Sequence, residues 1–410
     1  MSYGRYSDVL GDGNFRRFWF SMLPADLGYS MFELAITWLA ISLSHSSAIT
    51  GLVLFVEFAT YSLTAVIGPV IDAHPDKKTF IIRIFPVQAV IAILLTVLIV
   101  FRAMTVPLTI FIAFIMALLW DFPWLAQTAI LPLIMKRERL LQANSLMQAF
   151  GGGSTIFVNA LAGFIIAFAG VQGVSAIYAF TFLISAAAMT TVKVPATSGQ
   201  VAGGPGIIHR LKEGWQYAMN GKRKDLRELF VVSGLQGFFS VAPVLLVAVI
   251  SFVSLHGNVA EYGLLNGIFL AGGFTGNFVL GKLNPVKKLG KVMLITTIAE
   301  GLLIALSAVA SRNIPALDVL WFALGCCDPV FYNSQSSYLQ ATVESDYIAR
   351  VKGNAYLFRG LGRGSGNLVL GCVILYFGIA PGALFFGFSL IMLASLLMGI
   401  KSEMRILSYS

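Results

Sequence analysis

The chain has 410 residues, of which 57% are hydrophobic and only 11% charged, with a net charge of +9. Soluble domains carry about 25% charged residues, so this composition excludes an ordinary soluble protein. The positive charge is spread over short loops, which argues against nucleic acid as a partner. The apolar residues stand in long blocks such as residues 80–101. Because a bilayer-spanning helix needs roughly 20 mostly apolar residues, we expect an all-α protein of the lipid bilayer.

Twelve apolar segments are predicted to cross the bilayer. Residues 1–17 are polar and the first apolar block is a complete span, so we expect the first helix to direct insertion without a cleavable signal peptide. The predicted spans are residues 18–43, 48–71, 79–101, 107–134, 140–168, 172–192, 229–254, 261–281, 291–310, 314–340, 352–377 and 381–400.

The basic residues orient these spans, because cytoplasmic loops collect Lys and Arg. With twelve spans, 23 of the 28 basic residues fall on the side that holds both termini, and the opposite side holds only Arg102 and Arg312. Both termini are therefore predicted to be cytoplasmic. We expect a multi-pass protein of the plasma membrane that acts as a monomer.

The longest connector divides the chain into two halves. Residues 193–228 begin with a Gly- and Pro-rich linker and continue with residues 207–219, where apolar and basic side chains can occupy opposite faces of a short helix on the cytoplasmic membrane surface. Residues 1–192 and 229–410 then form an N-terminal and a C-terminal six-helix half.

Similar motifs recur in the two halves. Asp121 stands beside Pro123 in the fourth predicted span, and Asp328 stands beside Pro329 in the tenth. Internal repeats of this kind are common in secondary transporters, whose substrate site lies near the bilayer midplane between the repeats. The pattern therefore favours a carrier.

The loop after the second predicted span carries a family signature. Gly68 is followed four residues later by Asp72, and then by the basic pair Lys77 and Lys78. This arrangement resembles the loop signature of the major facilitator superfamily, although Ala73 replaces the usual basic residue. The resemblance implies two six-helix halves that rock around a central cavity, with Asp72, Lys77 and Lys78 forming a latch on the cytoplasmic side.

Two further motifs resemble the bacterial macrolide-efflux and siderophore-exporter branch of that superfamily. They are residues 14–19, Asn-Phe-Arg-Arg-Phe-Trp, and residues 143–146, Ala-Asn-Ser-Leu. The resemblance implies proton-coupled export of a small amphipathic or hydrophobic solute, similar to a drug or a siderophore. An importer of a nutrient or siderophore on the same fold stays open, because the same acids serve both directions.

Acidic residues inside the predicted spans are candidates for proton coupling or substrate binding. An acid at mid-membrane costs about 2.5–3.5 kcal/mol on insertion scales, so it needs a partner, water or a function. Asp26 and Glu33 are seven residues apart and share one helical face, and Glu57 lies in the second span. A carboxyl in such surroundings can exchange protons near neutral pH. The alternative is a hydrogen-bonded carboxyl that joins two helices.

Three more acids extend this set. Asp121 and Asp328 lie next to prolines, which free a backbone carbonyl and permit bending, so either coupling or a structural hinge explains them. Glu300 has no basic neighbour in the ninth span.

Arg359 and Arg363 lie four residues apart in the eleventh span and share a helical face. Buried arginines need an anion, and we expect Asp328, Glu300 or Asp72 to supply it. Both a gating ion pair and a clamp for an anionic substrate fit this pattern.

Other site classes find little support in the sequence. Adjacent cysteines on a helix, such as Cys326 and Cys327, point about 100° apart and make a poor metal site, and the glycine clusters lack the Lys-Ser/Thr of a phosphate loop. We expect no metal, no cofactor and no enzymatic activity, and a small-molecule substrate and protons as partners.

Overall fold

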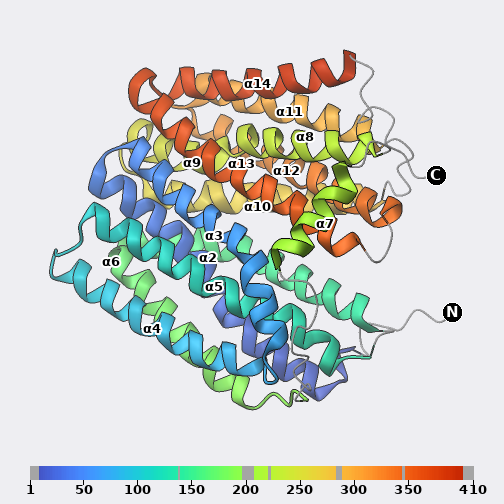
Figure 1. The fold of residues 1–410 in the computed structure, drawn as a ribbon. Helices are drawn as coiled ribbons and strands as arrows, with labels where there is room; N and C mark the ends of the chain where they lie inside the picture. The colour runs from blue at the N-terminus through green and yellow to red at the C-terminus, as the bar shows by residue number, and fades with distance from the viewer. Residues whose placement is uncertain are drawn as a thin grey trace. The chain divides into compact units, whose positions relative to one another are not determined.

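The computed structural model describes residues 9–136, 139–195, 207–219, 223–282, 289–343 and 347–399. All regular structure in these ranges is helical (Figure 1). The first five long helices are α2 (Gly13–Ser44), α3 (Ser47–Ala73), α4 (Lys78–Val100), α5 (Val106–Ile134) and α6 (Leu140–Thr190). They are followed by α7 (Ile207–Met219), α8 (Lys224–Ser240), α9 (Ala242–Val249), the π-helical turn η2 (Ile250–Ser254), α10 (Val259–Lys282), α11 (Leu289–Ala310), α12 (Ile314–Thr342), α13 (Ile348–Phe377) and α14 (Ile379–Gly399).

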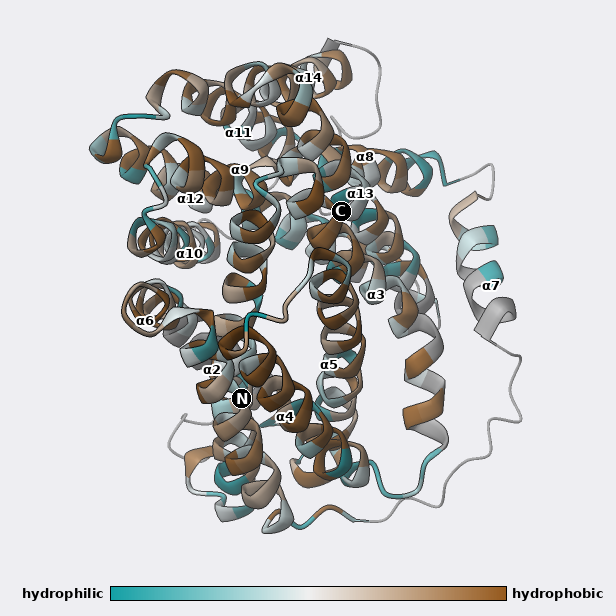
Figure 2. Ribbon diagram, turned by 90° about the vertical axis from the view of Figure 1, so that its left-hand side faces the viewer, coloured by the Kyte–Doolittle hydropathy of each residue, from teal (hydrophilic) through white to brown (hydrophobic). Residues whose placement is uncertain are grey.

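Ten helical segments in the described ranges are long and apolar enough to cross a membrane. Figure 2 shows apolar residues along most of the length of the long helices, and polar residues gathered in the connections. The segment formed by α8, α9 and η2 is one of the ten, whereas α13, which carries Arg359, Arg363 and Asn367, is not. The residues that the structure describes thus form an all-helical membrane protein with ten candidate spans.

Helix α6 contains the fifth and sixth predicted spans in one run of 51 residues. The run is interrupted at Gly170, which has φ 68° and ψ 179°. Only glycine adopts this backbone conformation readily, so Gly170 separates two helical stretches. The break lies between the spans that the sequence predicts at residues 140–168 and 172–192.

The chain forms two compact units. Unit 1 contains residues 1–39 and 63–204, and unit 2 contains residues 40–62 and 205–410. The end of α2 and the first part of α3 therefore form a hairpin, residues 40–62, that packs within unit 2.

Unit 1 is held together by aromatic stacking and buried amide contacts. The rings of Tyr29 on α2 and Trp120 on α5 stack with centroids 4.3 Å apart. The buried side chain of Gln88 on α4 donates hydrogen bonds to the hydroxyl of Tyr178 (3.2 Å) and to the carbonyl of Met116 (3.3 Å). These contacts join α2, α4, α5 and α6 around one core.

In unit 2, the hairpin packs along α13 at a seam of small residues, which we call the α3–α13 seam. The hydroxyl of Ser47 donates a hydrogen bond to the carbonyl of Gly371 (2.8 Å). A Cβ atom at Gly371 would lie 2.5 Å from the Ser47 carbonyl oxygen, and one at Gly364 would lie 3.3 Å from the Phe55 ring. The two backbones approach this closely because glycine lacks a side chain.

Helix α7 has the bounds that the sequence predicts, and it packs against α8 and α13. Trp215 of α7 stacks on Phe358 of α13, with ring centroids 5.4 Å apart. Next to α7, Arg223 forms an ion pair with Asp225 (2.9 Å) and donates hydrogen bonds to the Tyr217 hydroxyl (3.2 Å) and to the carbonyl of Thr342. This cluster fixes α7 to the ends of α8 and α12.

Candidate functional site

Two arginines on α13 form the centre of the candidate site. Arg359 and Arg363 lie one helical turn apart, and Arg359 is only 6% exposed. The guanidinium of Arg359 lies over the ring of Tyr332 and that of Arg363 over the ring of Phe58, each with Cζ 4.9 Å from the ring centroid. Such contacts contribute roughly 0.5–2 kcal/mol each, and they orient both side chains without neutralising their charge.

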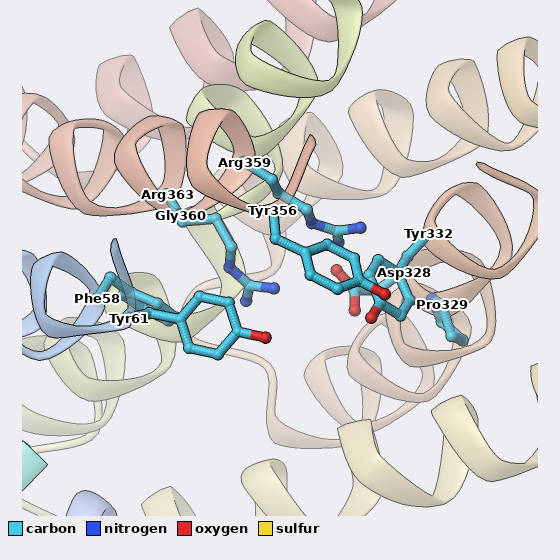
Figure 3. Close-up of a pocket in the computed structure, with 9 residues that line it drawn as sticks. All are labelled: Phe58, Tyr61, Asp328, Pro329, Tyr332, Tyr356, Arg359, Gly360 and Arg363. Atoms are coloured by element: carbon cyan, nitrogen blue, oxygen red, sulfur yellow. The ribbon is translucent and has the colours of Figure 1, made fainter. Parts of the chain in front are cut away.

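The two arginines line a cavity of about 280 Å³ within unit 2. Figure 3 shows both guanidinium groups extending from α13 into this space. The lining residues come from α3, α12 and α13, and they are Phe58, Tyr61, Asp328, Pro329, Tyr332, Tyr356, Arg359, Gly360 and Arg363. Tyr332 and Tyr356 stack on each other with centroids 5.6 Å apart, so the wall opposite the hairpin is also aromatic.

Asp328 and Glu300 place two carboxyl groups near the arginines. Asp328 lines the cavity, and Glu300 on α11 is 2% exposed and accepts a hydrogen bond from the amide of Gln236 on α8 (3.2 Å). Both carboxyl groups interact electrostatically with Arg359. Neither arginine, however, belongs to an ion pair among the described residues.

Both arginines also carry donors that stay open. Within the described parts of the chain, Nη1 of Arg359 and Nε of Arg363 are buried and have no hydrogen-bond partner. Buried polar groups in proteins are almost always hydrogen-bonded, and leaving a charged group unsatisfied costs more than leaving a neutral one. The arrangement can therefore accept an anion.

The remaining candidate acids are distributed over both units. Glu57 is partly buried in the α3 part of unit 2, whereas Asp26, Glu33 and Asp121 belong to unit 1. Asp121 is 5% exposed, and Glu33 is exposed and interacts electrostatically with Tyr178. Of the residues that the sequence singles out, the structure brings Glu300, Asp328, Arg359 and Arg363 into one neighbourhood.

The basic pair of the loop signature makes local contacts within unit 1. The ammonium of Lys78 donates hydrogen bonds to the carbonyls of Thr190 (3.1 Å) and Val192 (2.8 Å), and so caps the C-terminal end of α6. Lys77 is buried and donates to the carbonyl of His74 (3.3 Å). The side chain of Asp72 lies outside the described residues.

The motif at residues 14–19 also serves packing. The Asn14 side chain donates to the carbonyl of Lys193 (2.7 Å) and accepts from its backbone N–H (2.9 Å). This pair of hydrogen bonds ties the start of α2 to the chain that leaves α6. In the other motif, the side chains of Asn144 and Ser145 lie outside the described residues.

Several residues of the site are not evident from the sequence. Phe58, Tyr61, Tyr332 and Tyr356 are ordinary aromatic residues of apolar spans, and no spacing marks them as cavity-lining. The carboxyl groups of Glu261 and Asp318, on α10 and α12, lie within hydrogen-bond reach of each other. The sequence places both acids near the ends of predicted spans. That their carboxyl groups lie close together depends on how α10 and α12 pack.

The family model of the Major Facilitator Superfamily matches residues 18–367. The chain belongs to the major facilitator superfamily. The match includes all the candidate site residues, and superfamily members are transporters in the membrane, not enzymes. A comparison with the sequences of characterised proteins finds no significant match.

Solved structures of other superfamily-type transporters share the fold. The nucleoside transporter NupG is similar with a TM-score of 0.75 at 14% identity, covering 94% of this chain and 98% of that one. A POT family transporter crystallised with a thioalcohol-conjugated peptide has a TM-score of 0.72 at 11% identity, covering 94% and 95%. The human organic anion transporter MFSD10 (TETRAN) has a TM-score of 0.67 at 12% identity, covering 96% and 100%.

Proposed function

We propose that this superfamily member is a secondary active transporter of the plasma membrane, which exports a small amphipathic or hydrophobic solute by alternating access in exchange for protons. The observation that carries the proposal is the cavity on α13, which Asp328, Arg359 and Arg363 line among apolar helices, with Glu300 nearby. Charged groups at such positions are rare in membrane proteins and mark substrate or ion pathways.

The proposed topology has twelve spans and cytoplasmic termini. In this topology α6 supplies two spans on either side of Gly170, and α13 is the eleventh span despite its arginines. The halves are residues 1–192 and 229–410, joined by the linker 193–228. The distribution of basic residues supports this orientation, and the protein acts as a monomer.

In this topology the α3–α13 seam is the external gate. The hairpin of residues 40–62 lies in the N-terminal half of the proposed repeat, whereas α13 lies in the C-terminal half. The seam therefore joins the two halves at the ends that the orientation places outside. We propose that separating the seam exposes the cavity to the external solution.

Proton coupling is assigned to the intramembrane acids. Asp26 is the first candidate, and Glu33, Glu57, Asp121, Glu300 and Asp328 complete the set. Asp72, Lys77 and Lys78 remain the proposed latch on the cytoplasmic side. Support comes from the position of these acids within apolar helices, where a carboxyl without a function would be costly.

The test uses purified protein in liposomes that contain a pH-sensitive dye. A proton gradient is imposed, and a panel of drugs, dyes and siderophores is added. We expect at least one compound to trigger proton flux in the wild type and not in Asp26→Asn. Asp12→Asn is the matched control, because Asp12 accepts hydrogen bonds from the backbone N–H groups of Asn14 and Phe15 and Asn caps a helix nearly as well.

Flux that persists in Asp26→Asn would move the proton site to another acid of the set. No proton flux with any compound would contradict coupling. The importer is the alternative, and labelled substrate in whole cells separates the two directions: export predicts lower accumulation in cells that contain the protein, and import predicts higher accumulation.

A further inference from the structure

The two arginines differ in their surroundings. Asp328 and Glu300 both interact electrostatically with Arg359. Arg363 instead faces the ring of Phe58 and has a buried Nε with no partner among the described residues. Arg363 therefore lines the cavity beside an aromatic ring and has no ion-pair partner among the described residues.

The shape of the guanidinium group defines the preferred anion. Arginine presents parallel N–H donors that match the two oxygens of a carboxylate, and such bidentate pairs are among the strongest hydrogen bonds in proteins. Arg359 lines the same cavity one helical turn away. A carboxylate between the two arginines can pair with the guanidinium N–H groups that face the cavity.

The walls of the cavity favour a flat, apolar body next to that carboxylate. Four of its nine lining residues are aromatic, with Phe58 and Tyr61 on the hairpin and Tyr332 and Tyr356 on the opposite wall. Aromatic rings prefer offset-stacked or edge-to-face contact with other rings. At about 280 Å³, the cavity is slightly smaller than the range of roughly 300–1,000 Å³ for ligand sites. This size suits one ring or two fused rings.

We infer that this cavity binds a small aromatic carboxylate, with Arg363 as the residue that pairs with the carboxylate and the four aromatic side chains as the walls that hold the ring. The inference rests on the proposed transport function and narrows its substrate class from amphipathic solutes to aromatic monoanions. A purely structural ion pair is disfavoured, because neither arginine contacts a described carboxylate.

Binding of radiolabelled benzoate to the purified full-length protein tests the inference. Unlabelled 2-naphthoate, benzyl alcohol, benzylamine, acetate and inorganic phosphate serve as competitors. We expect 2-naphthoate to displace benzoate, and the neutral and cationic ring compounds to fail at the same concentration. Acetate and phosphate should compete at least about tenfold more weakly, because they lack the ring.

Variants assign the binding to the named residues. Arg363→Gln should weaken benzoate binding at least about tenfold, because it removes the charged donor, and Arg363→Lys should restore part of the affinity. Arg312→Gln is the matched control, since Arg312 is exposed outside the cavity. If Arg363→Gln does not fold, Phe58→Leu provides a second test: it keeps an apolar side chain and removes a ring that contacts Arg363, so benzoate and 2-naphthoate should both bind several-fold more weakly.

Three results would overturn the inference: no benzoate binding to the wild type, equal competition by benzylamine or phosphate, or unchanged benzoate binding in folded Arg363→Gln.

Failure of the proposed transport function can be distinguished from failure of this inference. If benzoate does not bind while another compound drives proton flux, only the substrate class is wrong. If benzoate binds through Arg363 and neither it nor any panel compound crosses the membrane, the site stands and the transport proposal falls.

Discussion

We predict that the substitution Gly371→Ala opens the α3–α13 seam. A Cβ at this position would lie 2.5 Å from the carbonyl oxygen of Ser47 and 3.0 Å from Cα of Ala48. Both contacts are with backbone atoms, which cannot rotate away, so the hairpin must move outward. The matched variant is Gly353→Ala on the same helix, where an added Cβ meets nothing within 4 Å.

The magnitude follows from comparing these two variants. Both gain about 1 kcal/mol of helix propensity on changing Gly to Ala, and this gain cancels in the comparison. Overpacking typically costs about 1–3 kcal/mol, and only the closed seam suffers it. Since each 1.4 kcal/mol is a factor of ten, the ratio of open to closed seam should rise roughly 5- to 150-fold in Gly371→Ala relative to Gly353→Ala.

The assay is the rate at which a membrane-impermeant maleimide labels Ser47→Cys from outside. Ser47 is 6% exposed and lies in the seam, and the native Cys326, Cys327 and Cys372 are replaced by Ser. In the Gly371→Ala variant, the thiol introduced by Ser47→Cys should be labelled roughly 5- to 150-fold faster, and transport should be slower. In the Gly353→Ala variant, the labelling rate should match that of the Ser47→Cys protein without either glycine change. Equal labelling rates in the two variants would refute the seam as a gate that steric pressure can open.

Three further predictions concern stability, measured as the thermal unfolding temperature in detergent. Arg223→Gln breaks the ion pair with Asp225 and should cost about 1–2 kcal/mol; an unchanged unfolding temperature would contradict this role. Asp318→Asn keeps a hydrogen bond to Glu261 and should unfold like the wild type, whereas Asp318→Ala should unfold at a lower temperature. Lys78→Met should lower stability by about 0.5–1 kcal/mol, and Lys78→Arg should recover most of the loss.

The positions of the helices can be predicted from the sequence because the apolar runs are long and the connections between them are polar. The sequence predicts a span at residues 107–134, and α5 covers Val106–Ile134. Where Gly or Pro marks the end of a predicted span, that end agrees with the end of the observed helix to within a few residues. The break in α6 at Gly170 lies between the spans that the sequence predicts at residues 140–168 and 172–192.

The site is less predictable, because it depends on contacts between distant segments. The spacing of Arg359 and Arg363 places them on one face. Their need for an anion points to Asp328, Glu300 or Asp72, and the structure places the first two near Arg359. No local pattern can show that Phe58 and Tyr61, about 300 residues earlier, form the other wall. The role of Lys78 is also hidden, because its acceptors are carbonyls more than 110 residues away.

The hairpin of residues 40–62 affects how this protein can be divided. A cut in the linker would not give two self-sufficient pieces, because a fragment of residues 205–410 would lack Phe58 and Tyr61 and would leave the glycines of α13 uncovered. Two co-expressed fragments would regain the cavity only by inserting the hairpin against α13. The same insertion could occur between two copies of the chain, as in domain swapping, so split-protein complementation is a direct measure of how strongly this hairpin binds.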